Sequence, residues 1–518
     1  MPEAPQAPTN RQTAIQTFIT LIVTDKYTKN QEIIYIVLMI LLLTHRKFWS
    51  ENPALLLAIC ILIGSSSYLF WPSPLNLLFP ALWALYLIAV GSWPLIILLV
   101  ASIFYCTFLY PKVPTGTTGY FSITSLQPYQ SPFQKGLLYK GAIFIDGQKV
   151  PCHVHHSSIN PPKANCDYIL EGALVETAPY NYLFKAKKWT PIKRTWSFAQ
   201  YRFQLKERLR LFLEEKLQRP KTAIFLGSLL TGDVQDRALR FEFSRLGLQH
   251  ILAVSGFHFA ILIAFCSFFL SYIFSNRWKI IVLLLAIHAY FFFVGPLPAV
   301  QRSWLIATLY LTGKLISRHS SALNLLGVAL LIELILDPLI SSNLGFQLSF
   351  TSCFGLLLLS PHLNFQIQQS PNGLSNASCH IYLISNFWRK AFSLTLAVNL
   401  ALLPLLLTHF HKFPLLSILY NLFFPFLVSI AMFILLISLI VHLFSPPIAA
   451  IFFQIVDLFT SQILELSTYP PIALDYSIHT PSFPGWIIPF YLFALFCLTN
   501  RLHSGNISGF YGDRSSVG

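Results

Sequence analysis

Long apolar runs separated by short polar turns recur along most of this chain, and each predicts a helix. We expect about thirteen of them, at 32–45, 54–70, 75–91, 94–110, 250–275, 280–296, 299–314, 322–337, 343–360, 390–408, 420–443, 447–465 and 485–500. Most of these runs are about long enough to cross ~30 Å of hydrocarbon. The pattern therefore predicts a polytopic α-helical membrane protein, with about four spans in the N-terminal region, 1–110.

Composition agrees with this fold class. Of the 518 residues, 55% are hydrophobic and 11% charged, and the mean hydropathy is +0.61. A soluble protein of this length needs far more charge to cover its surface. The first apolar run ends in the basic stretch THRKFW and lacks the small residues of a cleavage site, so we interpret it as an uncleaved span.

Positive charge in the short loops predicts the orientation of the chain. The spans alternate without conflict if the loops that carry Lys and Arg are cytoplasmic; these residues are Arg46, Lys47, Arg277, Lys279, Lys314, Arg318, Arg389, Lys390 and Arg501. The N-terminus and the polar interval 111–249 then lie outside. The tail, 501–518, lies in the cytoplasm.

Residues 111–184 change from the helical to the strand pattern. The stretch GAIFIDGQKVPCHVHH predicts two strands around an Asp146-Gly147 turn, and short alternating segments lie on either side. Five or so short strands in this space predict a small β-barrel outside the membrane, with an OB-like fold as one candidate.

Two cysteines of this β-domain, Cys152 and Cys166, are candidates for a disulfide, because the domain is placed in an oxidising compartment. Two alternatives stay open. Histidines at 153, 155 and 156 next to Cys152 allow a zinc site, although their spacing is poor for zinc. The other alternative is two free, buried thiols.

Residues 185–221 form a basic, aromatic and partly amphipathic segment, with twelve Lys or Arg against three Glu. Apolar positions recur at helical spacing from about 197 to 218. The candidate DNA-binding residues are Lys185, Lys187, Lys188, Lys193, Arg194, Arg202, Lys206, Trp189 and Trp196. Cations that release counterions from phosphates, and aromatic rings that stack on bases, favour a single-stranded nucleic acid. A helix on anionic lipid headgroups is the rival interpretation.

Polar residues interrupt the apolar runs of 222–500. For any one of them an interhelical hydrogen bond is the simpler explanation, but together they suggest a polar path through the bundle. The candidate lining residues are Asp233, His250, Ser255, Gly256, His258, Arg302, Gln347 and Asn399. Ser255 and His258 would share one helix face.

Motifs for catalysis are missing from the sequence. Ser255 lies in A-V-S-G-F and not in a G-x-S-x-G elbow, and the chain has neither a Walker A motif nor H-E-x-x-H. We therefore expect no enzyme activity, no cofactor and no metal.

Four ordered motifs between 225 and 443 resemble the competence domain of ComEC-type DNA-internalisation proteins. They are LLTGD with GLQHILAVSGFHFAIL, PAVQRSWLIATLYLTGKLISR, DPLISSNLGFQLSFTSCFGLLLL, and NLALLPLLLTHFHKFPLLSILYNLFFPFLV. The resemblance implies a multi-pass channel in the bacterial inner membrane that takes up single-stranded DNA during natural transformation. It also implies a separate cytoplasmic ATPase motor and a periplasmic DNA receptor as partners, besides DNA and lipid.

Many members of that family end in a metallo-β-lactamase-like domain, whereas this chain ends shortly after its last predicted span and has no H-x-H-x-D-H motif. We therefore expect degradation of the other DNA strand to reside in another protein. Two other classes stay open. A small-solute or ion transporter would use the same polar residues, and a receptor or scaffold would have no conduit.

Overall fold

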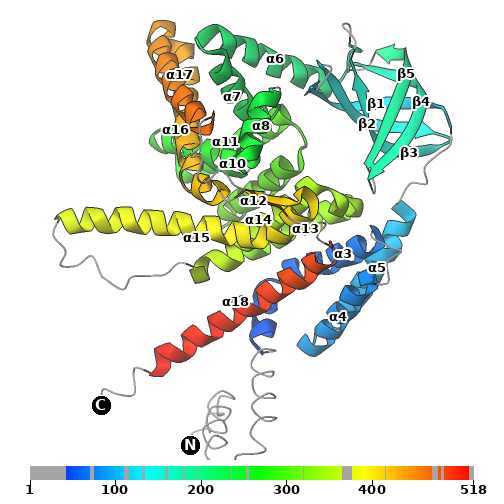
Figure 1. Ribbon diagram of the computed structural model, residues 1–518, viewed down its shortest axis with the longest axis vertical. Coiled ribbons are helices and arrows are strands. Elements are labelled where there is room, and N and C mark those ends of the chain that lie inside the picture. Colours follow the sequence, from blue (N-terminus) through cyan, green and yellow to red (C-terminus); the bar gives the residue numbers. More distant parts are fainter. Residues whose placement is uncertain are drawn as a thin grey trace, which may run out of the picture.

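The structure is a computed structural model that describes residues 43–512, apart from 70–74, 110–115, 131–134, 158–160, 179–180, 195, 235, 253–255, 319, 364–375, 415, 469–476 and 480–483. Figure 1 shows a β-barrel beside a large assembly of helices, with α6 (Phe198–Lys216) running from the barrel across one end of the helical bundle.

The barrel is closed and has five strands. They are β1 (Thr118–Gln130), β2 (Lys135–Ile145), β3 (Gln148–His156), β4 (Cys166–Ala178) and β5 (Asn181–Arg194), in the order β1-β2-β3-β5-β4. Pairing of β1 with β4 and a short parallel contact of β3 with β5 complete the circle. The predicted small barrel is confirmed, and closure by a five-stranded Greek key is the arrangement of OB-like barrels.

Turn chemistry and side-chain alternation explain this barrel. Asp146 and Gly147 both have positive φ, 51° and 78°, as the tight turn between β2 and β3 requires. Alternate side chains such as Phe121, Tyr139 and Phe184 fill the interior.

Strand β5 corrects the predicted domain boundary at residue 184. The strand continues to Arg194, so the first part of the basic segment belongs to the barrel, and only the part from Phe198 on is helical. Tyr182 and Phe184 are buried while Lys185 and Lys187 are exposed. This is the alternation of a half-buried strand, which the density of positive charge concealed in the sequence.

The amphipathic helix predicted near 197–218 is confirmed as α6. Its N-cap Ser197 accepts a hydrogen bond from the Ala199 amide, 3.2 Å. Helix α7 (Pro220–Thr231) begins with proline and ends at Gly232 in the left-handed conformation. Helices α8 (Arg237–Arg245) and α9 (Gln249–Leu252) follow.

The other helices match the predicted apolar runs. They are α3 (Pro53–Leu69), α4 (Leu75–Val90), α5 (Leu95–Leu109), α10 (Gly256–Ile273), α11 (Asn276–Val294), α12 (Pro298–Leu315), α13 (Ala322–Leu336), α14 (Leu344–Leu363), α15 (Asn376–Phe410), α16 (Leu416–Phe444), α17 (Pro446–Thr468) and α18 (Ile487–Gly512). A 3-10 turn, η1 (Pro338–Ser342), joins α13 to α14, and β6 (Lys412–Pro414) pairs with β7 (Ser477–His479).

Two expectations about the spans need revision. Within the described residues, five helices are long and apolar enough to cross a membrane, or six if Leu43–Glu51 and Pro53–Leu69, which meet at 99°, form one bent span. The expected number of about thirteen is therefore not confirmed. The run 250–275 divides into α9 and α10 around residues 253–255, and most of the first run, 32–45, lies outside the described residues.

Helix α7 lies at the centre of the largest apolar core. Nine of its residues are buried, between Thr222 and Thr231. Residues of α6, α8, α9, α16 and α17 share this core. The helix is therefore enclosed by protein, and its position holds the loop after Gly232 against the middle of α6, where Asp233 contacts Lys206 and Arg210.

Candidate functional site

The predicted site residues of α10, α12 and α14 lie at the end of the bundle nearest the barrel. Arg202, one turn into α6, donates from Nε to the Phe292 carbonyl near the end of α11, 2.7 Å. A Cβ on Gly256 would lie 3.7 Å from Arg302 Nη2, and one on Gly345 would lie 3.8 Å from Pro298 Cγ. The first turns of the three helices therefore meet at this end.

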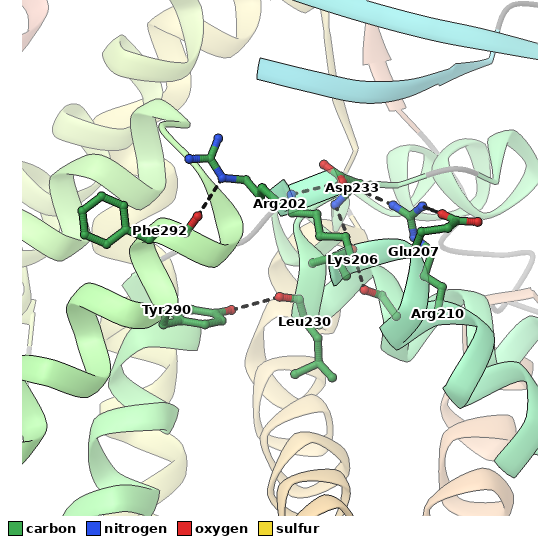
Figure 2. Close-up of polar contacts among 10 residues, drawn as sticks. Arg202, Lys206, Glu207, Arg210, Leu230, Asp233, Tyr290 and Phe292 are labelled. Carbon is green, nitrogen blue, oxygen red and sulfur yellow. Dashed lines mark hydrogen bonds and ion pairs between the residues drawn. The ribbon is translucent and has the colours of Figure 1, made fainter. Parts of the chain in front are cut away.

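Asp233 is the centre of a buried ionic cluster at the same end, shown in Figure 2. Its Oδ2 lies 3.1 Å from Lys206 Nζ and 3.3 Å from Arg210 Nη2. The side chains of Asp233 and Lys206 are each 3% exposed and that of Arg210 is 9% exposed. Glu207 adds a second ion pair to Arg210 at 2.8 Å. We call Lys206, Arg210 and Asp233 the Asp233 cluster.

Burial and charge act in opposite directions on the lysines of this region. Burial lowers the pKa of Lys206, and the nearby Asp233 carboxylate opposes that shift. Burial also lowers the pKa of Lys140 on strand β2, and Asp233 opposes the shift there too. The field of Asp233 thus reaches both α6 and the barrel.

These contacts give three of the candidate residues a partner inside the protein. Lys206 and Arg202 were candidate DNA contacts, but Lys206 neutralises Asp233 inside the protein, and Arg202 holds the end of α11. Asp233 was a candidate lining residue, but two cations cover one of its oxygens. The sequence conceals this because Asp233 is 27 residues beyond Lys206 and reaches it only through the fold.

Among the candidate DNA-binding residues, the exposed cations lie on β5. We define the β5 basic surface as Lys185, Lys187, Lys188, Lys193 and Arg194, all of which are exposed. Lys188 contacts Glu171 at 3.4 Å in a pair that is itself exposed. The surface holds five of the twelve Lys and Arg residues of the segment 185–221.

The two candidate tryptophans differ in their surroundings. Trp196 is 74% exposed, and its ring meets Phe198 edge-on at 4.3 Å between centroids. Trp189 is half-buried and packs against the aromatic core of the barrel; its ring neighbours are Phe121, Tyr139, His156 and Tyr168. Trp196 can offer a face to a base, whereas Trp189 is occupied by packing.

Arg302 is the buried cation of the bundle end. Its side chain is on α12 and 6% exposed, and Nη1 donates to Cys353 Sγ on α14. The guanidinium lies 6.0 Å from the centroid of the Phe350 ring. A Cβ on Gly256 would meet Ser303 Oγ at 3.1 Å, so glycine at this position lets α10 begin close to α12.

The remaining lining candidates have mixed environments. His258 is buried, at 1% exposure, and His250 on α9 is exposed. Gln347 donates from Nε2 to the Ser341 carbonyl at 2.8 Å, and Asn399 donates to the Thr395 carbonyl of its own helix at 2.9 Å. Both side chains thus donate to backbone carbonyls nearby in the chain, as groups that support local structure do. Ser255 lies outside the described residues.

Glu333 is a buried ionisable residue that was not among the candidates predicted from the sequence. It is 1% exposed on α13, and within the part of the chain that the structure describes neither carboxylate oxygen has a hydrogen-bond partner. The signal was present, because Glu333 is the one charged residue of the apolar run before Asp337.

The predicted disulfide is also corrected. Cys152 and Cys166 are free thiols, the first buried and the second half-buried. Cys152 lies beside Tyr182 at one end of β5, whereas Cys166 faces Arg194 at the other, so the register separates them. Among the described residues no three His, Cys, Asp or Glu side chains are arranged to hold a metal ion.

Comparison with known proteins adds to this geometry. The family model described as "Competence protein" matches residues 229–504. ComE operon protein 3 of Bacillus subtilis (strain 168) is 30% identical over 203 residues, which are 38% of this chain and 24% of the relative. The match thus covers about a quarter of that relative's length. No solved structure matches the chain.

Proposed function

From the premise that this chain belongs to the competence protein family, we propose that it forms the route by which single-stranded DNA crosses the inner membrane during natural transformation. The observation that carries the proposal is the family match, which spans more than half of the chain and all helices from α8 to α17. A role in DNA uptake during competence follows from the family; the single-stranded conduit is our proposal.

The β5 basic surface supports a DNA contact outside the bundle. Its five cations are exposed, and four of them have no ion pair among the described residues. Cations on a barrel strand can follow a phosphate backbone, and the exposed Trp196 beside them can stack on a base. We propose that DNA meets this surface before it reaches the bundle.

The bundle end next to the barrel supplies polar groups for the next step. We propose that Arg302, Gly256 and the two histidines, His250 and His258, lie along the path, with Ser255, Gln347 and Asn399 as further candidates. A hydrated anionic strand needs polar or cationic walls in a low-dielectric bundle. Arg302 can supply a full positive charge there.

Orientation and partners are part of the same proposal. We place the barrel outside, the C-terminal tail in the cytoplasm and about thirteen helices across the bilayer. The sequence holds no recognisable nucleotide-binding motif, so we propose a separate cytoplasmic ATPase as motor and a periplasmic DNA receptor as donor. The chain itself would transport without catalysing a reaction.

DNA binding to the purified full chain at several salt concentrations tests the surface. Replacing Lys187, Lys188, Lys193 and Arg194 by Ala should flatten the dependence of affinity on salt, since each phosphate contact contributes about 0.7 to the logarithmic slope for single strands. A matched control replaces four cations at or near the ends of α11 and α12, Arg277, Lys279, Lys314 and Arg318, of which all but the half-buried Lys279 are exposed. An unchanged slope, with weaker binding to anionic liposomes, would favour the lipid-surface interpretation instead.

Uptake in cells tests the conduit. Cells with the gene should internalise labelled DNA, and cells without it should not. Uptake of small solutes, measured in parallel, should not depend on the gene. Loss of solute uptake alone would favour the small-solute transporter, and loss of neither would favour a scaffold.

A further inference from the structure

Glu333 is a buried carboxyl group in an apolar environment. Its helix neighbours Leu330 and Leu334 belong to a core that includes Phe346 and Phe350 of α14. Neither carboxylate oxygen has a hydrogen-bond partner among the described residues. An ionised carboxylate in such a place costs several kcal/mol, unless a cation or hydrogen-bond donors compensate it. The neutral, protonated acid fits this site.

Two other buried carboxylates of this protein each have a cation that compensates their negative charge. Asp233 is paired with Lys206 at 3.1 Å. Asp457 on α17, 2% exposed, is paired with Arg219 at 3.0 Å and accepts a hydrogen bond from Thr222. Glu333 has no ion pair within 4.0 Å in the described part of the chain, so it differs from both.

Among the described residues, Arg302 is the cation near enough for its charge to act on Glu333. Helices α12, α13 and α14 pack on one another, and Arg302 reaches the shared core, where it contacts Cys353 and Phe350. Its Nε has no partner among the described residues. An ion pair between Arg302 and Glu333 would give both side chains a partner. In this structure the two side chains are not paired with each other.

Other ionisable groups on the elements around Glu333 are few. Helix α3 and η1 carry no Asp, Glu, Lys, Arg or His, while α14 carries His362 and α12 carries Lys314 in their last turns. Asp337 follows α13, and its carboxylate accepts from the Leu339 amide at 3.1 Å. Asp337 therefore offers Glu333 no compensating positive charge.

We propose that Glu333 is a proton-binding site that controls whether the positive charge of Arg302 is free to hold an anion. With the carboxyl O–H intact, Arg302 is uncompensated and can take a phosphate of the DNA strand. When the O–H bond breaks and the proton passes to water, the carboxylate neutralises Arg302. The part that concerns phosphate rests on the proposed function, whereas the proton site does not.

Labelling with dicyclohexylcarbodiimide, which modifies protonated carboxyl groups in apolar surroundings, tests the site on the purified full chain. Mass spectrometry should find the N-acylurea on Glu333 at pH 6, with a decline as pH rises. Asp457 is the matched control, since it is equally buried but paired, and it should stay unlabelled. In Arg219→Gln, Asp457 loses its cation and should become reactive.

Arg302→Gln gives the decisive comparison. Loss of a nearby cation strengthens proton binding by a carboxyl group, so the pH at which Glu333 labelling falls by half should rise by about 1 unit or more. Arg302→Lys, which keeps the charge, should stay close to the native profile and also serves if the glutamine variant does not fold. A short single-stranded oligonucleotide should raise labelling at fixed pH, because linkage is reciprocal.

Two results would overturn the proposal: an unlabelled Glu333 at pH 6 in folded protein, or profiles of the native, Arg302→Gln and Arg302→Lys proteins that coincide. If only the oligonucleotide failed to change labelling, Arg302 would not bind a phosphate of the DNA strand, and this result would count against the proposed conduit. The pH dependence of labelling would still support Glu333 as a proton-binding site.

Discussion

Replacing Asp233 by Asn should release α6 from the bundle end. The change keeps the size of the side chain and removes the negative charge that Lys206 and Arg210 share. Lys206 then stays buried with only a neutral amide oxygen to meet it. Arg210 retains Glu207 at 2.8 Å, so its loss is smaller.

The magnitude follows from these contacts. Removing one partner of a buried ion pair typically costs about 3 to 5 kcal/mol. Since the Asp233→Asn variant keeps one acceptor for Lys206 and Arg210 keeps its second partner, we expect a cost of about 2 to 3 kcal/mol for local opening of α6. At 1.4 kcal/mol per factor of ten, amide hydrogens of α6 should exchange roughly 30 to 150 times faster.

Hydrogen exchange measured by mass spectrometry on the purified full chain is the assay. The control is Glu215→Gln in the same helix, because the Lys216–Glu215 pair is exposed and should contribute little. Peptides of the barrel interior report whether the variant is folded. If Asp233→Asn and Glu215→Gln gave α6 exchange rates within a few-fold of each other, the Asp233 cluster would not hold the helix, and the reasoning would fail.

Three other predictions use matched pairs or a single thiol. Trp196→Ala should weaken binding of single-stranded DNA by about 1 to 3 kcal/mol and leave the fold intact. Trp189→Ala should instead destabilise the barrel by several kcal/mol, because its ring packs against the aromatic core. Oligonucleotide titration measures the first effect and thermal unfolding the second. Gly327→Ala should lower membrane abundance, because its Cβ would lie 2.3 Å from the Leu55 amide nitrogen, while Gly227→Ala meets nothing closer than 3.7 Å and should be tolerated; immunoblots of membranes measure both. Burial raises the pKa of the Cys152 thiol to about 12, so maleimide should fail to label it in folded protein at pH 8 and should label it after unfolding. A failure to label in the unfolded state that a reductant reverses would instead reveal a bridge.

Much of the fold could be predicted from local pattern. Apolar runs predicted the helices because each apolar face must be covered by lipid or protein, and this constraint acts residue by residue. The Asp146-Gly147 turn predicted its hairpin, because few residue pairs accept positive φ twice. The number of membrane crossings could not be deduced in the same way, since short apolar helices such as α13 can lie within a bundle as well as across a bilayer.

The candidate site depended on contacts between distant residues, which pattern does not encode. The charges of α6 suggested a DNA-binding face, but Lys206 turns inward to Asp233. Trp189 was predicted to stack on a base, but its ring packs against other rings of the barrel, such as that of Tyr139. Glu333 was visible as a charge in an apolar run, but its lack of a partner among the described residues is a property of the packed helices α12, α13 and α14.

The central position of α7 has a consequence for how the protein is made. The barrel joins strands that are close in sequence, so it can fold soon after β5 leaves the ribosome. Helix α7 packs against α17, and Thr222 donates a hydrogen bond to Asp457, which lies 235 residues later in the chain. At 5 to 20 residues per second, about 12 to 47 seconds pass before that partner exists. During this interval the apolar surface of α7 requires temporary cover from lipid, from α6 or from the insertion machinery, and completion of the bundle end must be one of the last events of biogenesis.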